Sequence, residues 1–438
     1  MKVSTYALAI GLAGFTFSAS AAAQYDEPKG AKNTQTTIRG GSGSAVSKSE
    51  EKAKQKQEAD KLSSGRKLDI SKEARKAVIE LQTAVNANDT ASIPAKLAAA
   101  QAVAKTNDDR YVIAVNQTKA ATAAGDLAGM RAGIDALRAS GGAETADLVS
   151  RYTNLGKRYY DAKQLDQAAG AFEAAVAVDA NNPDALKMLA STRDAQGRRG
   201  DAVSLMAKSI AAAKAAGTKL KESDYKFAAR IAYDAKSPAA AEITRAWLAD
   251  YPNPTNWRDG LRIYRDINGL DGDAKIDVMR LARAANALNG EADYYNFAEE
   301  LVTRGYLNEA KAVLDEGGTK KAIDLNKTVF KQFAPKLAKA PSRATIDAAS
   351  KTALNGSAKA AMEAGDVLYG IGAFTEAAPL FKAAVAKGGV DANEANLRLG
   401  MALARAGDKS GATAALNAVT GPQANIAKYW LIWVNSQG

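Results

Sequence analysis

The side chains that could do chemistry in this chain are few in kind, because it contains no histidine and no cysteine. Histidine is the commonest general base and metal ligand, and zinc sites of the usual kind need one or the other residue. Carboxylates, lysine, tyrosine, serine and threonine remain. Paired acids such as Glu299 and Glu300 are typical of solvated helix faces, and no Gly-rich phosphate loop is present. We therefore expect no metal site and no cofactor.

One dipeptide, Glu222-Ser223, resembles the start of the active site of lytic transglycosylases. Those enzymes act in the cell envelope and carry helical superhelices. The Gly-rich helix start that their family places downstream is replaced here by Asp224-Tyr225-Lys226-Phe227. We therefore expect that the protein is not an enzyme, and we keep peptidoglycan cleavage as a remote alternative.

The element that must position any binding side chains is a repeat, because one pattern occurs twice, 34 positions apart. The first copy contains Tyr152, Leu155, Gly156, Tyr159, Ala168, Phe172 and Ala175. The second contains Leu186, Leu189, Ala190, Gly197, Ala202, Met206 and Ser209. A fixed large and small pattern at this period is typical of helical hairpins that stack on one another.

This pattern resembles the tetratricopeptide repeat (TPR) family, with further copies at 364–384, 399–416 and 294–314. In that family, small residues at the helix crossing let two helices approach closely, and large ones fill the groove. The proline usual at the end of the second helix is replaced by Ala180. The resemblance implies an all-α, right-handed α-solenoid of stacked hairpins, a TPR-like superhelix with a concave binding surface.

The start of the chain has the features of an export signal. Lys2 gives a positive start, Tyr6–Phe17 is apolar, and Ala21–Ala23 is a small-residue cleavage site before Gln24. We therefore predict a signal peptide over 1–23 and a periplasmic or secreted product. Residues 24–65 are rich in Gly, Ser, Thr, Lys and Glu, which predicts a disordered linker.

Helix-breaking residues at short intervals divide the rest into segments of helix length. We predict divergent N-terminal hairpins (66–148), TPR-like repeats (149–217), divergent TPR-like hairpins (218–318), a basic helical insert (319–357), TPR-like repeats (358–421) and a C-terminal helix (422–438). The last helix has one very apolar face and should cap the final repeat, since a terminal repeat has no neighbour. The alternative is a helix that docks a partner. That face comprises Ile426, Tyr429, Trp430, Trp433 and Val434.

The TPR resemblance also implies which side chains line the concave groove. When the groove positions of the family are transferred to this sequence by aligning the repeats, they fall on Lys157, Tyr160, Lys187, Asp194, Tyr295, Glu299, Asp366, Tyr369 and Arg405. Chaperone-binding members of the family hold a terminal carboxylate with a Lys/Asn clamp. Lys187 stands at one clamp position, but Ser191 occupies the place of the Asn, so this clamp is not expected.

Residues 319–360 carry a net charge of +7, with nine basic and two acidic side chains, which is most of the net charge of +11. The basic patch comprises Lys320, Lys321, Lys327, Lys331, Lys336, Lys339 and Arg343. Apolar residues among them predict a helical segment with one buried face, made by Ile323, Val329, Phe330, Phe333 and Leu337.

Two functions follow from these features. The first is an exported scaffold of the cell envelope that holds a protein or peptide partner in its groove. The alternative is binding of an anionic polymer or membrane surface through 319–360. Export argues against nucleic acid as a partner.

Overall fold

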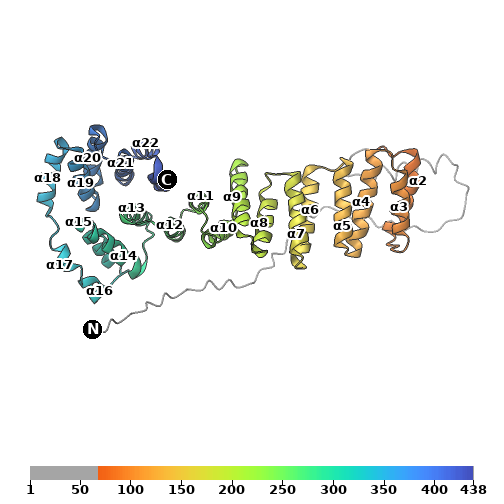
Figure 1. Ribbon diagram of the computed structural model, residues 1–438, viewed down its shortest axis with the longest axis horizontal. Coiled ribbons are helices and arrows are strands. Elements are labelled where there is room, and N and C mark those ends of the chain that lie inside the picture. Colours follow the sequence, from red (N-terminus) through yellow and green to blue (C-terminus); the bar gives the residue numbers. More distant parts are fainter. Residues whose placement is uncertain (1–67, 438) are drawn as a thin grey trace, which may run out of the picture. The chain divides into compact units, whose positions relative to one another are not determined.

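The computed structural model describes residues 68–437. The predicted signal peptide (1–23) and linker (24–65) lie outside the described residues. Every regular element in the described range is helical (Figure 1), which confirms the all-α expectation. Within 68–437, no helix combines the length and the apolar character needed to cross a membrane.

The first part of the described chain consists of consecutive antiparallel helices. Their bounds are α2 (Lys72–Asn86), α3 (Ile93–Val103), α4 (Asn107–Ala124), α5 (Leu127–Ser140), α6 (Thr145–Asp161), α7 (Leu165–Val178), α8 (Pro183–Ala195), α9 (Arg199–Ala215), α10 (Glu222–Asp234) and α11 (Ala240–Asp250). Each even-numbered helix packs on the next odd-numbered one as a hairpin. We call the even-numbered members of these hairpins A helices.

The second part begins with the same pattern, so that α12 and α14 are also A helices, and then departs from it. Its elements are α12 (Pro254–Asn268), α13 (Gly272–Ala284), α14 (Gly290–Thr303), α15 (Leu307–Thr319), α16 (Thr328–Lys331), α17 (Ala334–Leu337), α18 (Arg343–Asn355), α19 (Ala358–Gly370), α20 (Phe374–Lys387), α21 (Ala392–Ala406), α22 (Lys409–Asn417), the 3₁₀ helix η1 (Gly421–Gln423) and α23 (Ala424–Asn435). After the interruption the hairpins resume as α19 with α20 and α21 with α22.

Local sequence explains where these hairpins turn. The turn between α8 and α9 contains Gly197 with a φ of 78°, a left-handed conformation that glycine adopts without steric cost. Asn182 starts α8, because its side chain accepts a hydrogen bond from the backbone N–H of Ala185. In the preceding hairpin Lys163 takes the left-handed position instead, with a φ of 62°.

Close helix crossings hold each repeat together. A Cβ built on Gly156 would lie 2.6 Å from Cε1 of Phe172, so the ring occupies the space that a side chain would need. The same relationship joins Gly365 to Phe381 at 2.7 Å. Ala168 is fully buried at the same crossing. The small residues of the repeat pattern therefore lie where helices approach most closely.

The segment predicted as a basic helical insert (319–357) is not one helix. It contains two single-turn helices, α16 and α17, followed by α18, and Pro335 and Pro341 prevent a continuous helix. Phe330 and Phe333 are buried as expected, whereas Val329, predicted on the same face, is 41% exposed.

The C-terminal helix α23 packs on α21 and α22, and it also contacts α11 and α13. The Tyr429 hydroxyl donates to the carbonyl of Ala241 at 3.1 Å and lies 2.5 Å from the Thr244 hydroxyl oxygen. One hydrophobic cluster extends accordingly from Ala241 in α11 to Val434 in α23. The helix predicted as a cap therefore also joins the end of the chain to its middle.

Candidate functional site

The predicted groove residues fall into two groups that differ in surroundings. Lys157, Tyr160, Lys187 and Asp194 lie on the A helices α6 and α8, and all four are partly exposed. The others lie on α14, α19 and α21, where neighbouring segments cover them to different degrees.

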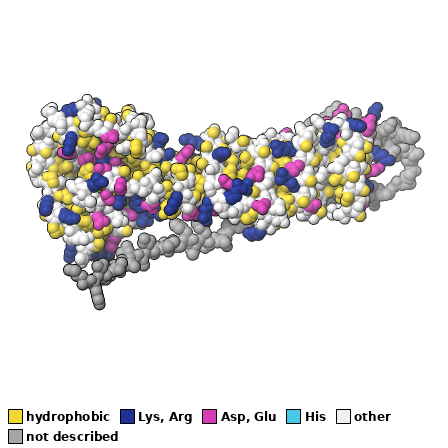
Figure 2. All heavy atoms as spheres, viewed as in Figure 1, with side chains coloured by type: hydrophobic (Ala, Val, Ile, Leu, Met, Phe, Trp, Pro, Cys, Tyr) yellow, Lys and Arg dark blue, Asp and Glu magenta, His cyan; other side chains and the backbone are white. Residues whose placement is uncertain are grey.

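Around the first group, ion pairs join α8 to α10 and, further along the chain, α12 to α14. Lys187 Nζ on α8 lies 3.2 Å from Asp224 Oδ2 on α10, and Arg230 on α10 lies 2.9 Å from Asp194 on α8. Arg258 on α12 continues the series, 3.0 Å from Asp293 on α14. We call this series the inter-repeat ion pairs. Figure 2 shows Lys and Arg side chains mixed with Asp and Glu side chains over the visible face of the molecule.

The two charges predicted for the groove are thus engaged within the protein. Burial disfavours the charge of Lys187, but hydrogen bonds and charges from Asp184 and Asp224 outweigh it and raise its pKa. Asp194 accepts from Arg230 and also lies 3.5 Å from Arg199. Both side chains therefore have fixed positions, and a ligand would meet them as part of a preformed surface.

Aromatic side chains beside these ion pairs were missed from the sequence. The guanidinium of Arg230 lies 5.4 Å from the ring centre of Phe227, and that of Arg262 lies 5.8 Å from the ring centre of Tyr233. Tyr233 is 38% exposed. The spacing of opposite charges could have pointed here, because Arg230 follows Asp194 by 36 positions, close to one repeat.

Tyr295 and Glu299, predicted as groove residues of the central repeat, hydrogen-bond to each other at 3.0 Å. The Tyr295 ring packs against Phe333, with ring centres 5.5 Å apart, and against Phe330 at 6.4 Å. Burial is the main cause that raises the Tyr295 pKa. The segment around α16 and α17 thus covers one side of this ring.

Asp366 and Tyr369 are placed in the interior rather than on an open groove, which corrects the expectation that they face a partner. Asp366 is 7% exposed and Tyr369 is 4% exposed. Burial raises the pKa of Tyr369 to about 12. Arg405, their predicted neighbour, is partly exposed and stacks over the Phe374 ring at 4.6 Å.

These buried residues belong to an ionic cluster built by four helices. Arg280 on α13 lies 2.6 Å from Glu309 on α15 and 3.3 Å from Asp366 on α19. Arg398 on α21 lies 2.9 Å from Asp366 and also pairs with Asp277 on α13. We call these five residues the buried ionic cluster.

The cluster contains three carboxylates and two guanidinium groups. Burial raises the pKa of Asp366 to about 7 and lowers that of Arg398 to about 10. One proton taken up by a carboxyl group would balance the charges. Because a buried charge needs a partner, we interpret the cluster as a structural joint between α13, α15, α19 and α21.

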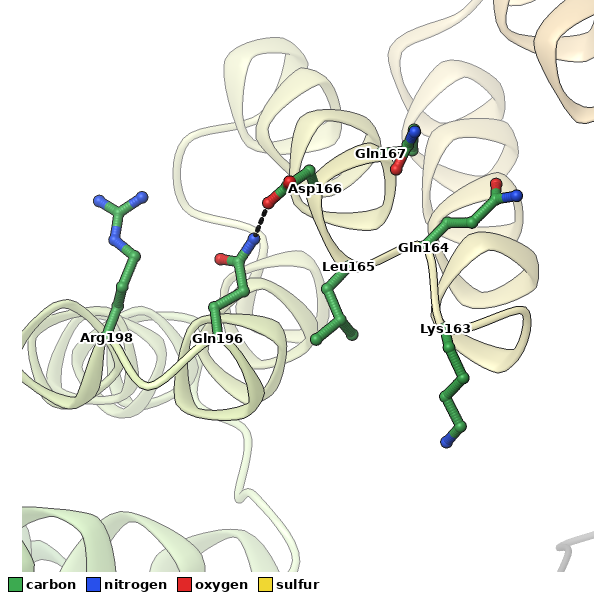
Figure 3. A pocket seen from close by; sticks show the side chains of 7 residues that line it. All are labelled: Lys163, Gln164, Leu165, Asp166, Gln167, Gln196 and Arg198. Carbon is green, nitrogen blue, oxygen red and sulfur yellow. Dashed lines mark hydrogen bonds between the residues drawn. The ribbon is translucent and has the colours of Figure 1, made fainter.

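Three hollows in the surface of residues 68–437 bring no convergent charged groups together. One of about 490 Å³ lies between the turns of two successive hairpins (Figure 3). Gln196 donates to Asp166 there at 2.7 Å, while Lys163 and Arg198 extend away from each other. No group of acids suited to a metal ion occurs in residues 68–437. The Glu222 carboxylate accepts a hydrogen bond from the side-chain amide of Asn256 at 2.9 Å and pairs with Lys226 at 2.8 Å.

The predicted basic patch divides into paired and unpaired lysines. Lys320 lies 2.8 Å from Glu316, and Lys327 pairs with Glu291. Arg343 lies 2.7 Å from Asp347 and also pairs with Glu376. No ion pair within the described residues involves the other members, which are Lys321, Lys331, Lys336 and Lys339.

Comparison with solved structures finds repeat proteins. A tetratricopeptide repeat protein from Parabacteroides merdae is 14% identical, over 67% of this chain and 99% of its own, with a TM-score of 0.28. The C-terminal part of a TPR repeat-containing protein from Cytophaga hutchinsonii is 14% identical, over 74% of this chain and 99% of its own, with a TM-score of 0.25. A chain of the APC/C hetero-tetramer Cut9-Hcn1 is 12% identical, over 83% of this chain and 81% of its own, with a TM-score of 0.18.

No family model and no curated protein sequence matches this chain. The assignment of its fold rests on its own geometry. Helical hairpins follow one another at the repeat spacing, and at three crossings a small residue of the pattern lies against a large one, as Gly156 does against Phe172. The chain therefore has a TPR-like fold, an all-α stack of helical hairpins.

Proposed function

We propose that this chain is an exported scaffold of the cell envelope that binds a peptide or protein partner on the face of its A helices α6, α8, α10 and α12. The observation behind this proposal is the set of inter-repeat ion pairs, Lys187–Asp224 and Asp194–Arg230, which fix charged side chains in a row across successive repeats. A stack of hairpins offers an extended surface of this kind.

The chemistry of this face suits a polypeptide partner. Arginine, tyrosine and phenylalanine are enriched at protein interfaces, and here Arg230 lies over Phe227 and Arg262 over Tyr233. Side chains already held in position lose little entropy when a ligand binds. Tyr160 on α6 adds a partly exposed aromatic ring at the other end of the row.

The helices that follow α12 do not contribute to the proposed partner-binding face. Asp366 and Tyr369 are enclosed, and α23 closes on α11 through Tyr429. The side chains available to a partner are therefore those of α6 to α12, and the closed part supports them. Export rests on the predicted signal peptide at 1–23, and the envelope is where such a scaffold would work.

Site-specific photo-crosslinking tests the partner-binding face. A photoreactive amino acid is placed at Tyr160 or Tyr233 on the A helices, and at the exposed Lys208 on α9 as the control. The proposal expects one discrete adduct from both A-helix positions, and none from Lys208. Adducts at Lys208 alone, or equal adducts at all three positions, would contradict it. Cell fractionation tests export separately, through loss of the first residues and release with the periplasmic fraction.

A further inference from the structure

The segment between α15 and α18, residues 320–341, combines exposed apolar side chains with an excess of lysine. Among the described residues, four large apolar side chains are markedly exposed, and two of them lie here: Leu325 at 39% and Val329 at 41%. Exposure of a large aliphatic side chain loses the free energy that its burial would give. A local concentration of such residues is typical of an interaction surface.

The charge of this segment is one-sided. It contains six lysines and a single acid, Asp324. Lys320 and Lys327 pair with acids of α15 and α14. The remaining four are exposed and form no ion pair within residues 68–437: Lys321, Lys331, Lys336 and Lys339. Their mutual repulsion would be relieved by an external anionic surface.

The exposed side chains are presented on a packed support. Ile323, Phe330 and Phe333 are buried in the cluster formed with α14 and α15, and Tyr295 contacts both phenylalanine rings. These anchors fix the inner side of the segment, so that Leu325 and Val329 remain on its outer side. Figure 1 shows α16 and α17 where the chain passes from α15 to α18.

We propose that residues 320–341 are a peripheral membrane contact, in which the four unpaired lysines bind anionic lipid headgroups and Leu325 and Val329 enter the interfacial layer. The apolar pair favours a lipid surface over an anionic polysaccharide, because aliphatic side chains gain nothing from a hydrated polymer. Anionic headgroups and shallow apolar insertion together are the usual basis of such binding. This inference is independent of the partner-binding face on α6 to α12.

Co-sedimentation with vesicles tests the electrostatic part. The probes are phosphatidylcholine vesicles with and without phosphatidylglycerol, at low and high salt. Near an anionic surface each lysine contributes about 1 kcal/mol, or about fivefold in affinity. Changing Lys321, Lys331, Lys336 and Lys339 to Gln should therefore weaken binding by about two orders of magnitude or more. The matched control changes four exposed lysines elsewhere, Lys208, Lys214, Lys219 and Lys221, to Gln and should retain most binding.

A fluorescent label tests whether the apolar side chains enter the lipid layer. Because the sequence contains no cysteine, one introduced cysteine is labelled specifically. Leu325→Cys carrying a polarity-sensitive dye should shift to the blue with phosphatidylglycerol vesicles, and Tyr233→Cys on α10 should not. If the protein binds soluble dextran sulfate as tightly as vesicles, and the dye does not shift on vesicles, the ligand is an anionic polymer and not a lipid surface. That result would overturn the proposal. Absence of vesicle binding at low salt, or equal loss in both lysine variants, would also overturn it.

Discussion

Gly156 lies against the ring of Phe172, sixteen positions later, with no room for a Cβ between them. Gly365 has the same relationship to Phe381, and Gly400 to Leu416, where a Cβ would come within 2.5 Å of Cγ. The first helix of a repeat and the second helix thus meet at one small and one large residue. This contact sets how closely the two helices approach, and these three copies of the repeat share it.

The packing at this crossing predicts that glycine-to-alanine substitution has opposite effects on stability at Gly156 and at Gly200. Gly156→Ala should lower the free energy of unfolding by about 1–3 kcal/mol, because the added Cβ overlaps the Phe172 ring. A Cβ built on Gly200 in α9 would have no neighbour within 4 Å. Gly200→Ala should therefore raise the free energy of unfolding by up to about 1 kcal/mol, since alanine favours the helix. Urea unfolding of both variants measures this. Loss of stability at Gly200 equal to that at Gly156 would contradict the packing argument.

The buried ionic cluster predicts how stability varies with pH. Burial raises the pKa of Asp366 from 3.8 to about 7 in the folded protein. Between these values the folded state binds the proton more tightly than the unfolded state, so this residue stabilises the fold at low pH. That contribution should be lost as pH rises through about 7. Asp366→Asn should flatten the curve of unfolding free energy between about pH 4 and pH 8.

A control separates this effect from the general loss of a carboxylate. Asp315→Asn removes an exposed acid that pairs with Lys311 on the same helix. Its stability curve should run parallel to that of the unchanged protein over the same range. If the Asp366 variant also runs parallel, Asp366 is ionised throughout and Arg280 and Arg398 neutralise it fully.

The hairpins were predictable because the contacts that define them are local. Gly156 and Phe172, or Ala168 at the same crossing, belong to one repeat, and their types recur at a fixed period. The closure of the chain is different, since Thr244 and Tyr429 lie 185 positions apart. It results from the way many repeats pack in succession, and no local period records it.

The same reason explains which candidate site residues were misplaced. Asp366 and Tyr369 stand at register positions that face a groove when the stack is open. Here α13, α15 and α21 supply Arg280, Glu309 and Arg398 to the same place, and the side chains become buried. Lys187 and Asp194 stay partly exposed because, within residues 68–437, no helix after α9 packs extensively on α8.

The inter-repeat ion pairs should differ in strength according to their burial. The side chains of Lys187 and Asp224 are only 15% and 17% exposed, whereas those of Lys311 and Asp315 are 59% and 57% exposed. A double-mutant cycle with Lys187→Met and Asp224→Asn should give a coupling energy above about 1 kcal/mol, because water screens this pair less. The Lys311 and Asp315 cycle should give about 0.3–0.5 kcal/mol. Equal coupling in both cycles would show that the link between α8 and α10 adds little to stability.

The contact between α23 and α11 predicts that the end of the chain protects its middle. Removal of residues 422–438 should expose the last hairpin, and should also raise hydrogen exchange in α11 and α13, because α23 contacts both. A helix that only capped the last hairpin would leave α11 unchanged after truncation. Tyr429→Phe gives a milder test, since it removes the hydroxyl that donates to Ala241 and contacts Thr244. It should cost about 1 kcal/mol, with faster exchange in α11 but not in α8.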